Sequence, residues 1–260
     1  MDIKIIVAAH KKYWIPPDSV YMPLQVGAEG KQDIGFQKDN TGDNISYKNA
    51  NYCELTGLYW AWKNLQCDYI GLCHYRRYFG RPVFGNNIEK KQKAVFGRAD
   101  YEKLLQQYDV ILPKKRNYFI ETVRSQYEHA HMKKDLDMVE SIIAELYPEY
   151  KQAFEKVMNS RKLHLYNMFV MSKKNFDNYC TWLFKILSVL EKRIDMTGYS
   201  PYQARVYGFL SERLFNVWLN RNSLKIKEIN IINLEEINWI VKIFKFLKKK
   251  YGRKNDFRTV

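Results

Sequence analysis

Clusters of basic side chains follow three short apolar runs of the sequence. They are His10-Lys11-Lys12 after KIIVAA, His74-Tyr75-Arg76-Arg77 after DYIGLC, and Lys114-Lys115-Arg116 after YDVIL and Pro113. Ligands of open α/β sheets bind beyond the carboxyl ends of the strands, and Arg and Lys are the side chains that hold phosphate oxygens. Each cluster alone is typical of a solvated loop end, but the three together predict a site for a diphosphate. Neither a Walker loop nor GxGxxG is present, which disfavours a P-loop or dinucleotide fold.

Side chains that could transfer a proton are fewer. Glu212 is flanked by leucines in GFLSERLFNVWL, so we expect it near the core side of a helix, where a charge must be paired. Either it pairs with a distant arginine, or it lies at the edge of a site as a base or a ligand of the substrate. Tyr127, His131 and Asp135 are spaced i, i+4 and i+8. On one helix they would share a face suited to binding hydroxyl groups, and ordinary surface polarity explains them equally well.

The elements that would position these residues alternate between strands and helices. We expect strands at 4–9, 68–73, 108–112 and 166–171, and helices at 49–64, 100–107, 125–132, 135–146, 174–192 and 200–220. A long functional loop is expected at 27–42 and a non-periodic surface segment at 81–98. The alternation predicts the α/β class with a largely parallel sheet. The predicted organisation is one domain over residues 1–234 and a tail over 235–260.

The composition narrows the classes of partner. The 260 residues include 43 Lys and Arg against 28 Asp and Glu, a formal net charge of +15. Such a surface attracts nucleic acid, anionic lipid headgroups or phosphorylated small molecules. Four cysteines (Cys53, Cys67, Cys73 and Cys180) form neither a CxxC pair nor a zinc-binding spacing, which favours buried thiols in a reducing compartment. The first apolar run is too short for a signal peptide, and no uncharged run of about 18 residues is present, so we expect a cytoplasmic protein.

Five segments carry a resemblance to a known family. They are VAAHKKYW (7–14), TGDNISYKNANYCELTGLYWAWKN (41–64), DYIGLCHYRRYF (68–79), YNMFVMSKKNFDNYCTWLF (166–184) and RVYGFLSERLFNVWL (205–219). In this order, over about residues 3–220, they resemble a family of bacterial capsular and exopolysaccharide biosynthesis glycosyltransferases. The family has long been described as a domain of unknown function, and some members are similar to galactofuranosyltransferases. The resemblance implies a single GT-A-like, Rossmann-type domain that binds a nucleotide-sugar.

The resemblance also implies roles for particular residues. It suggests donor binding by seven residues, diphosphate neutralisation by Arg76 and Arg77, and site roles for Tyr166, Asn167 and Glu212. The seven are His10, Asn44, Ser46, Glu54, Tyr59, Trp62 and His74. We expect acceptor contacts from Tyr127, His131, Tyr166 and Asn167. If the reaction inverts the sugar's configuration, Glu212 or Asp135 would take the acceptor proton.

The expected reaction is transfer of a hexose, with galactofuranose as one candidate, from a UDP-sugar to a lipid-linked oligosaccharide in capsule, exopolysaccharide or O-antigen synthesis. No metal is expected, because DYIGLC ends in His-Tyr-Arg-Arg and not in the carboxylate pair of metal-dependent sugar transferases. A divalent ion such as manganese, held by His74, is the main alternative. A nucleic-acid-binding protein and a non-catalytic scaffold of a polysaccharide-assembly complex are the alternative functions. The first is disfavoured because no reading motif accompanies the charge.

The tail has a pattern of its own. In residues 236–251, Trp239, Ile240, Ile243, Phe244 and Leu247 follow a helical spacing, and five lysines supply the remainder. This basic amphipathic pattern is typical of a helix that lies on an anionic membrane, although a helix packed on the domain would show the same stripe. We therefore expect a peripheral protein at the inner face of the plasma membrane.

Overall fold

A computed structural model describes residues 1–235 of the chain. The large sheet contains β1 (Ile3–Ala9), β2 (Tyr21–Gln25), β3 (Gln37–Lys38), β4 (Tyr69–His74), β5 (Arg77–Gly80), β6 (Val110–Pro113), β9 (Phe169–Ser172) and β10 (Ile226–Asn233). A separate two-stranded ribbon joins β7 (Arg116–Asn117) to β8 (Lys162–Leu163). The helices are α1 (Asn49–Tyr52), α2 (Leu55–Asn64), α3 (Ile88–Ala94), α4 (Arg98–Leu105), α5 (Val123–Ala130), α6 (Lys133–Leu146), α7 (Lys151–Asn159), α8 (Lys173–Arg193) and α9 (Val206–Arg221).

The large sheet is mixed. Its strand order is β3-β2-β1-β4-β5-β10-β6-β9, and β9 also pairs with β4. The pairings β1–β2, β1–β4, β2–β3 and β6–β10 are parallel, whereas β4–β5, β4–β9, β5–β10 and β6–β9 are antiparallel. The α/β class is therefore confirmed, but the largely parallel sheet that we expected is confined to the β1–β2–β3–β4 side and to β6–β10.

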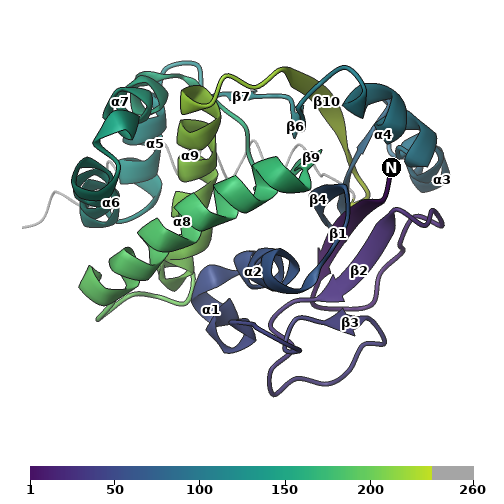
Figure 1. Cartoon of the computed structure of the whole chain (residues 1–260), viewed down its shortest axis with the longest axis horizontal. Helices are drawn as coiled ribbons and strands as arrows, with labels where there is room; N and C mark the ends of the chain where they lie inside the picture. The colour runs from purple at the N-terminus through teal and green to yellow at the C-terminus, as the bar shows by residue number, and fades with distance from the viewer. Residues whose placement is uncertain (236–260) are drawn as a thin grey trace, which may run out of the picture.

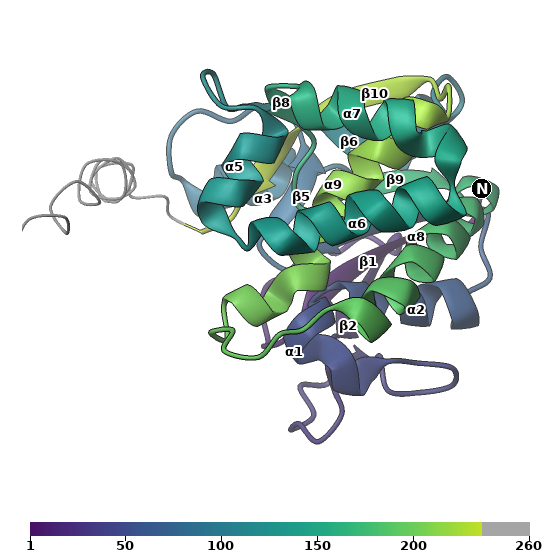
Figure 2. The ribbon, with the colours of Figure 1, turned by 90° about the vertical axis from the view of Figure 1, so that its left-hand side faces the viewer.

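Helices cover both faces of the sheet. Successive side chains of β1 point to opposite faces and so join two different core clusters. Ile6 and Ala8 join a core cluster with residues of α2, α8 and α9, and Ile5 and Val7 join a second cluster with residues of α4. In Figure 1, α5, α6 and α7 gather at one side of the molecule and β1, β2 and β3 lie at the other. Figure 2 shows α5 to α8 in front of the strands when the molecule is viewed from the helical side. No helix in the described part of the chain is long and apolar enough to span a bilayer.

Local sequence explains the longest helix. The Ser172 side chain accepts a hydrogen bond from the backbone N–H of Asn175 and caps the start of α8. Lys192 and Arg193 lie in its last turn, where cations interact favourably with the helix dipole. Its buried residues include Phe176, Cys180 and Leu187, and the Phe176 ring contacts Phe169 of β9. The expected helix at 174–192 is thus confirmed.

Several expected elements differ from the structure. The expected helix at 49–64 is two helices, because Cys53 adopts a positive φ of 55° between α1 and α2. The segment at 81–98 is not a plain surface loop but contains α3. The strand expected at 166–171 begins only at Phe169, because Tyr166 and Asn167 have positive φ angles. Strands β2, β5 and β10 and helix α7 were not expected.

Candidate functional site

A pocket with a volume of about 700 Å³ opens at the carboxyl ends of β1, β2 and β4. The parallel register pairs Ala8 with His74 and Ala9 with Gln25, so the residues that follow these strands meet at one edge. The predicted residues that line the pocket are His10, Glu54, His74, Arg76, Arg77, Tyr166 and Glu212. The second basic cluster therefore lies wholly at this site, whereas the first contributes only His10, because Lys11 and Lys12 do not line the pocket. Lys114, Lys115 and Arg116 are not among the residues that line it.

The pocket is rich in cations. Arg76, Arg77, Lys31 and Arg205 line it together with the two carboxylates Glu54 and Glu212. Arg76 is already paired, because its Nη1 lies 2.7 Å from Glu235 Oε1 and 2.8 Å from Glu235 Oε2. Arg77 has no carboxylate partner among the described residues, and its guanidinium lies 4.7 Å from the centre of the Tyr166 ring. Lys31 and Arg205 are exposed and also lack an ion pair within residues 1–235. Three cations thus remain available to an anionic ligand.

Tyr166 and Asn167 connect three side chains at the floor of the pocket by hydrogen bonds. Tyr166 and Asn167 have φ angles of 73° and 52°, a left-handed conformation that non-glycine residues rarely adopt. The Tyr166 N–H donates to Glu212 Oε1 at 2.8 Å, and the Tyr166 carbonyl lies 2.7 Å from His74 Nε2. Asn167 Nδ2 donates to Glu54 Oε1 at 2.7 Å. Strained backbone of this kind is concentrated at functional sites, and here it positions three chemically active side chains.

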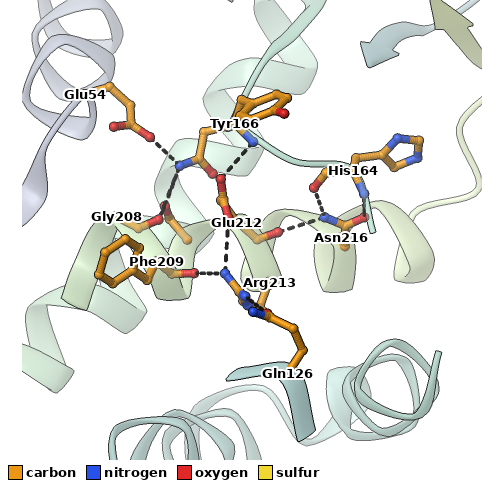
Figure 3. Close-up of polar contacts among 11 residues, drawn as sticks. Glu54, Gln126, His164, Tyr166, Gly208, Phe209, Glu212, Arg213 and Asn216 are labelled. Carbon is orange, nitrogen blue, oxygen red and sulfur yellow. Dashed lines mark hydrogen bonds and ion pairs between the residues drawn. The ribbon is translucent and has the colours of Figure 1, made fainter. Parts of the chain in front are cut away.

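Glu212 lies on α9 within a polar network (Figure 3). Its Oε2 accepts from Arg213 Nη1 at 3.1 Å, and Arg213 Nη2 donates to Gln126 Oε1 at 2.6 Å. The Arg213 side chain is only 4% exposed. Burial raises the pKa of Glu212, while the Arg213 charge and the Tyr166 N–H offset part of the rise. A raised pKa makes this carboxylate a stronger base than an exposed glutamate, which suits a group that accepts a proton.

The two histidines of the pocket favour the neutral form. Burial lowers the pKa of His74, although the Glu54 charge opposes this effect. Because a carbonyl oxygen can only accept, neutral His74 carries its proton on Nε2 and donates it to the Tyr166 oxygen. Burial, together with the charges of Lys11 and Arg76, lowers the pKa of His10. Neither imidazole is therefore expected to add a permanent positive charge to the pocket at neutral pH.

Sequence reasoning missed several lining residues, among them Lys31, Asn49, Cys53 and Arg205. The Cys53 thiol lies 3.1 Å from Arg205 Nε, and burial raises its pKa to about 11. Cys53 and Arg205 each fall inside segments that the resemblance covers, but neither residue type stood out there. Lys31 belongs to the glycine-containing loop at 27–42, which was expected to be functional without any residue being named.

The predicted donor-binding residues Asn44, Ser46, Tyr59 and Trp62 do not line the pocket. Asn44 caps a local turn, where its Oδ1 accepts from the Ser46 N–H at 3.2 Å. The Ser46 hydroxyl donates to the buried Asp39 carboxylate. Trp62 stacks on Phe184 with ring centres 5.6 Å apart, and Tyr59 meets the same ring edge-on. These side chains stabilise the fold. Asn44 and Ser46 hold the loop before α2, and Tyr59 and Trp62 pack α2 against α8.

The residues predicted to contact the acceptor are divided between two places. Tyr166 lines the pocket and Asn167 lies behind it, whereas Tyr127, His131 and Asp135 lie outside it. The two helices that we expected at 125–132 and 135–146 are present as α5, which ends at Ala130, and α6, which begins at Lys133, so Tyr127 and Asp135 do not share the face of one helix. Asp135 is 2% exposed and accepts from the Tyr199 hydroxyl at 2.6 Å. His131 stacks on Phe209. Asp135 is therefore not positioned to act as a base in this pocket.

Within residues 1–235, no group of three or more His, Cys, Asp or Glu side chains is arranged to hold a metal ion. His74 Nε2 is engaged with the Tyr166 carbonyl, and the Glu54 charge acts on the imidazole. The expectation that the protein needs no metal remains a prediction.

Comparison with known proteins gives three findings. Residues 4–223 match a protein family described as a domain of unknown function, DUF4422. The structure is similar to the apo structure of WbbM, a bifunctional glycosyltransferase, with a TM-score of 0.82 and 32% sequence identity. The similarity covers 91% of this chain and 46% of the WbbM chain, so this chain spans about half of that protein's length. No curated protein matches the chain.

Proposed function

Because this chain belongs to the DUF4422 family and shares its fold with part of a bifunctional glycosyltransferase, we propose that it is a glycosyltransferase. The observation that carries the proposal is the pocket at the carboxyl ends of β1, β2 and β4. There, three cations without carboxylate partners in the described chain surround a floor that holds two carboxylates. This arrangement is suited to a nucleoside diphosphate sugar, whose diphosphate is anionic and whose transfer requires a proton acceptor.

The proposed chemistry uses these groups in one step. An acceptor hydroxyl oxygen forms a bond to the anomeric carbon of the sugar, and the bond from that carbon to the diphosphate oxygen breaks. The diphosphate leaves with the bonding electron pair, and Arg77, Arg205 and Lys31 neutralise its charge. In an inverting reaction, the acceptor proton passes to Glu212, the one of our two base candidates that lines the pocket. Glu54, held in place by the Asn167 amide behind the pocket, would orient the substrates beside it.

The substrate that we propose is a UDP-hexose, with galactofuranose as one candidate sugar, and the acceptor is a lipid-linked oligosaccharide of a surface polysaccharide. Support comes from the family resemblance and from the cationic pocket. We also propose that the chain acts at the inner face of the plasma membrane, attached through its basic tail, and that nucleic acid is not its partner. The tail pattern at 236–251 lies outside the described residues.

Nucleotide binding tests this proposal directly. In a thermal-shift screen against UDP, GDP, CDP and dTDP, a ligand at about 100 times its dissociation constant stabilises the folded state by about 2.7 kcal/mol. We expect a clear rise of Tm with one nucleotide and no comparable rise with an oligonucleotide of equal charge. Release of free UDP from a UDP-sugar, dependent on enzyme, would then identify the activity. Binding of the oligonucleotide alone would favour a nucleic-acid-binding protein, and binding of nothing would favour a scaffold.

The proposed independence from divalent metal has its own test. It rests on the Arg76-Arg77 pair in the place where metal-dependent enzymes have paired carboxylates. We expect sugar transfer to continue in EDTA with unchanged kcat. Loss of turnover in EDTA and its recovery with manganese would instead assign an ion to the site.

A further inference from the structure

A tight turn exposes two large apolar side chains on the face that contains the β7–β8 ribbon. Phe119 is 72% exposed and Ile120 is 74% exposed. The turn is held by local hydrogen bonds, from the Phe119 N–H to Asn117 Oδ1 at 2.9 Å and from the Ile120 N–H to the Tyr118 carbonyl at 2.8 Å. The preceding Tyr118 is partly buried and packs against the core. The turn is therefore anchored while its tip faces outward.

The Phe119 backbone makes this exposure unusual. Its φ angle is 60°, in the left-handed region that favours glycine or asparagine and disfavours a bulky residue. A phenyl ring at such a position normally gains packing that offsets the strain, but Phe119 is mostly exposed. Isolated exposed apolar residues are common. Two adjacent ones on a strained and hydrogen-bonded turn point to contact with something outside the chain.

Basic side chains surround the turn. We name this set the basic ribbon surface, and it consists of Lys114, Lys115, Arg116, Lys156, Arg161 and Lys162, all exposed. The β7–β8 register places Asn117 opposite Lys162. Because alternate residues share a face, Lys115, Lys162 and His164 therefore lie on one side of the ribbon. None of the six cations forms an ion pair within residues 1–235. Their charge is available to an anionic partner.

A second pocket opens within this surface. Its volume is about 300 Å³, and Lys115, Lys156 and Lys162 line it together with His164 and several amide and hydroxyl side chains. His164 is 3% exposed, and its Nδ1 lies 2.6 Å from the Pro113 carbonyl, whereas its buried Nε2 has no hydrogen-bond partner among the described residues. Glu228 is the nearest acid, with Oε1 3.7 Å from Nε2. Three lysines around a polar floor are suited to a phosphate group.

We propose that the turn at 118–120 and the basic ribbon surface dock the protein on an anionic membrane. Phe119 and Ile120 enter the interfacial region, the lysines face the lipid phosphates, and the second pocket takes one lipid headgroup phosphate. An apolar turn beside the basic ribbon surface favours a lipid surface over nucleic acid, because Ile120 has no aromatic face on which a base could stack. This docking surface is formed by other residues than the tail at 235–260, and its pocket shares no lining residue with the donor pocket.

Vesicle binding by the full-length protein tests this surface. Co-sedimentation would use vesicles of phosphatidylcholine alone and vesicles with about 30% phosphatidylglycerol, the anionic fraction supplying the negative surface. We expect Phe119→Asn/Ile120→Ser to weaken partitioning onto the anionic vesicles at least tenfold. Asn is suited to the left-handed backbone at 119, so the fold should be kept. The matched control is Phe84→Ser, because Phe84 is 95% exposed on a different loop.

A charge variant tests the other half of the surface. We expect Lys115→Glu/Lys162→Glu to bind the anionic vesicles at least tenfold more weakly, and we expect that binding no longer to depend on salt concentration. The control is Lys93→Glu/Lys103→Glu, which makes the same change of charge on α3 and α4. It should bind the vesicles within about twofold of wild type. The tail is present in every protein compared. Equal partitioning of the turn variant and the Phe84→Ser control would overturn the proposal. The proposal would also be overturned if the charge variant lost binding to an oligonucleotide but still bound the anionic vesicles like the wild type. Nucleotide binding by the variants should be unchanged, which separates this test from that of the donor pocket.

Discussion

At the scale of single residues, the two neighbouring arginines after β4 are engaged differently. Arg76 is paired with Glu235 at 2.7 Å, and both side chains are about one-third exposed. Arg77 lies over the Tyr166 ring without a carboxylate partner in the described chain. Because an arginine already bound to a carboxylate must release it to bind a diphosphate, Arg77 is the better positioned of the two to stabilise the leaving group.

We therefore predict unequal effects of replacing these arginines. Arg77→Ala should lower kcat/KM about 100-fold, which corresponds to about 3 kcal/mol of lost transition-state stabilisation. Arg76→Ala should lower kcat/KM by a smaller factor. Arg77→Lys should keep only part of the wild-type kcat/KM, because an ammonium group lacks the planar fork of a guanidinium. The control is Arg81→Ala, since Arg81 pairs with Asp100 and does not line the pocket. Steady-state kinetics of UDP release would measure all four, and a fully active Arg77→Ala would refute the assignment.

Glu212 gives a prediction about pH. Burial raises its pKa above the ordinary value for glutamate of 4.5, so the base becomes protonated, and inactive, at a higher pH than an exposed glutamate would. As the pH is lowered, kcat/KM should therefore begin to fall at a pH above 4.5, which forms the acid limb of the pH–rate profile. Glu212→Gln should abolish that limb and lower kcat about 100-fold or more, the usual scale of general base catalysis. A pH–rate profile that is unchanged in Glu212→Gln would assign the limb to another group.

Residue types at strand ends were predictable from the sequence, and aromatic roles were not. His10, His74, Arg76 and Arg77 follow apolar strands, and parallel pairing brings them to one edge. Trp62 and Tyr59 belong to the same resembling segment as Glu54, yet they pack on Phe184, which is far away in the sequence. A pattern within one segment cannot reveal such a long-range contact, so sequence position alone did not separate packing aromatics from lining ones.

At the scale of elements, the Tyr166–Asn167 segment is the feature on which the pocket depends. It contacts β4 through His74, α9 through Glu212 and the start of α2 through Glu54. Asn167 Nδ2 also donates to Ser211 Oγ at 2.9 Å. These contacts come from three separate regions of the chain, and the left-handed backbone aims them at a common point.

We predict that two substitutions at Asn167 separate its backbone role from its side-chain role. Asn167→Gly keeps the φ of 52° but loses the amide hydrogen bonds, at a cost of about 1–3 kcal/mol. Asn167→Ala loses the same bonds and, unlike the glycine variant, keeps a Cβ in the left-handed region, for about 1 kcal/mol more. Urea unfolding would measure the difference. Equal stability of the two variants would mean that the backbone at 167 relaxes at no cost.

Strands and helices were predicted where the apolar pattern was long or strong, and missed where it was short. The buried run of β1 and the long face of α8 were both identifiable from their periodicity. In β10, by contrast, most side chains are partly exposed and only Ile232 is buried, so the strand carries little hydrophobic signal. The break at Cys53 was hidden for a different reason, since nothing in the residue type indicates a positive φ there.

At the scale of the whole molecule, the sheet extends beyond the family match. The match ends at residue 223, yet β10 at Ile226–Asn233 lies between β5 and β6 and pairs with both. Leu234, just after it, is 3% exposed. The resemblance that we found also stopped near residue 220. The family match therefore covers every residue that lines the donor pocket but not the whole folded unit.

This arrangement predicts how the chain tolerates truncation. A fragment of residues 1–223 lacks β10, which leaves two facing strand edges unpaired and removes the buried Ile232 and Leu234. A domain is stable by only about 5–15 kcal/mol, and losing a strand that is paired on both sides should remove most of that free energy of unfolding. We therefore expect this fragment to be insoluble or unfolded. A fragment of residues 1–235 keeps β10 and the Arg76–Glu235 pair, and we expect it to melt cooperatively and to bind the same nucleotide as the full chain. Circular dichroism melting and nucleotide thermal shifts would compare the two fragments. A cooperative melt for residues 1–223 would show that β10 is an accessory strand, and aggregation of residues 1–235 would show that the last 25 residues of the 260 pack on the domain.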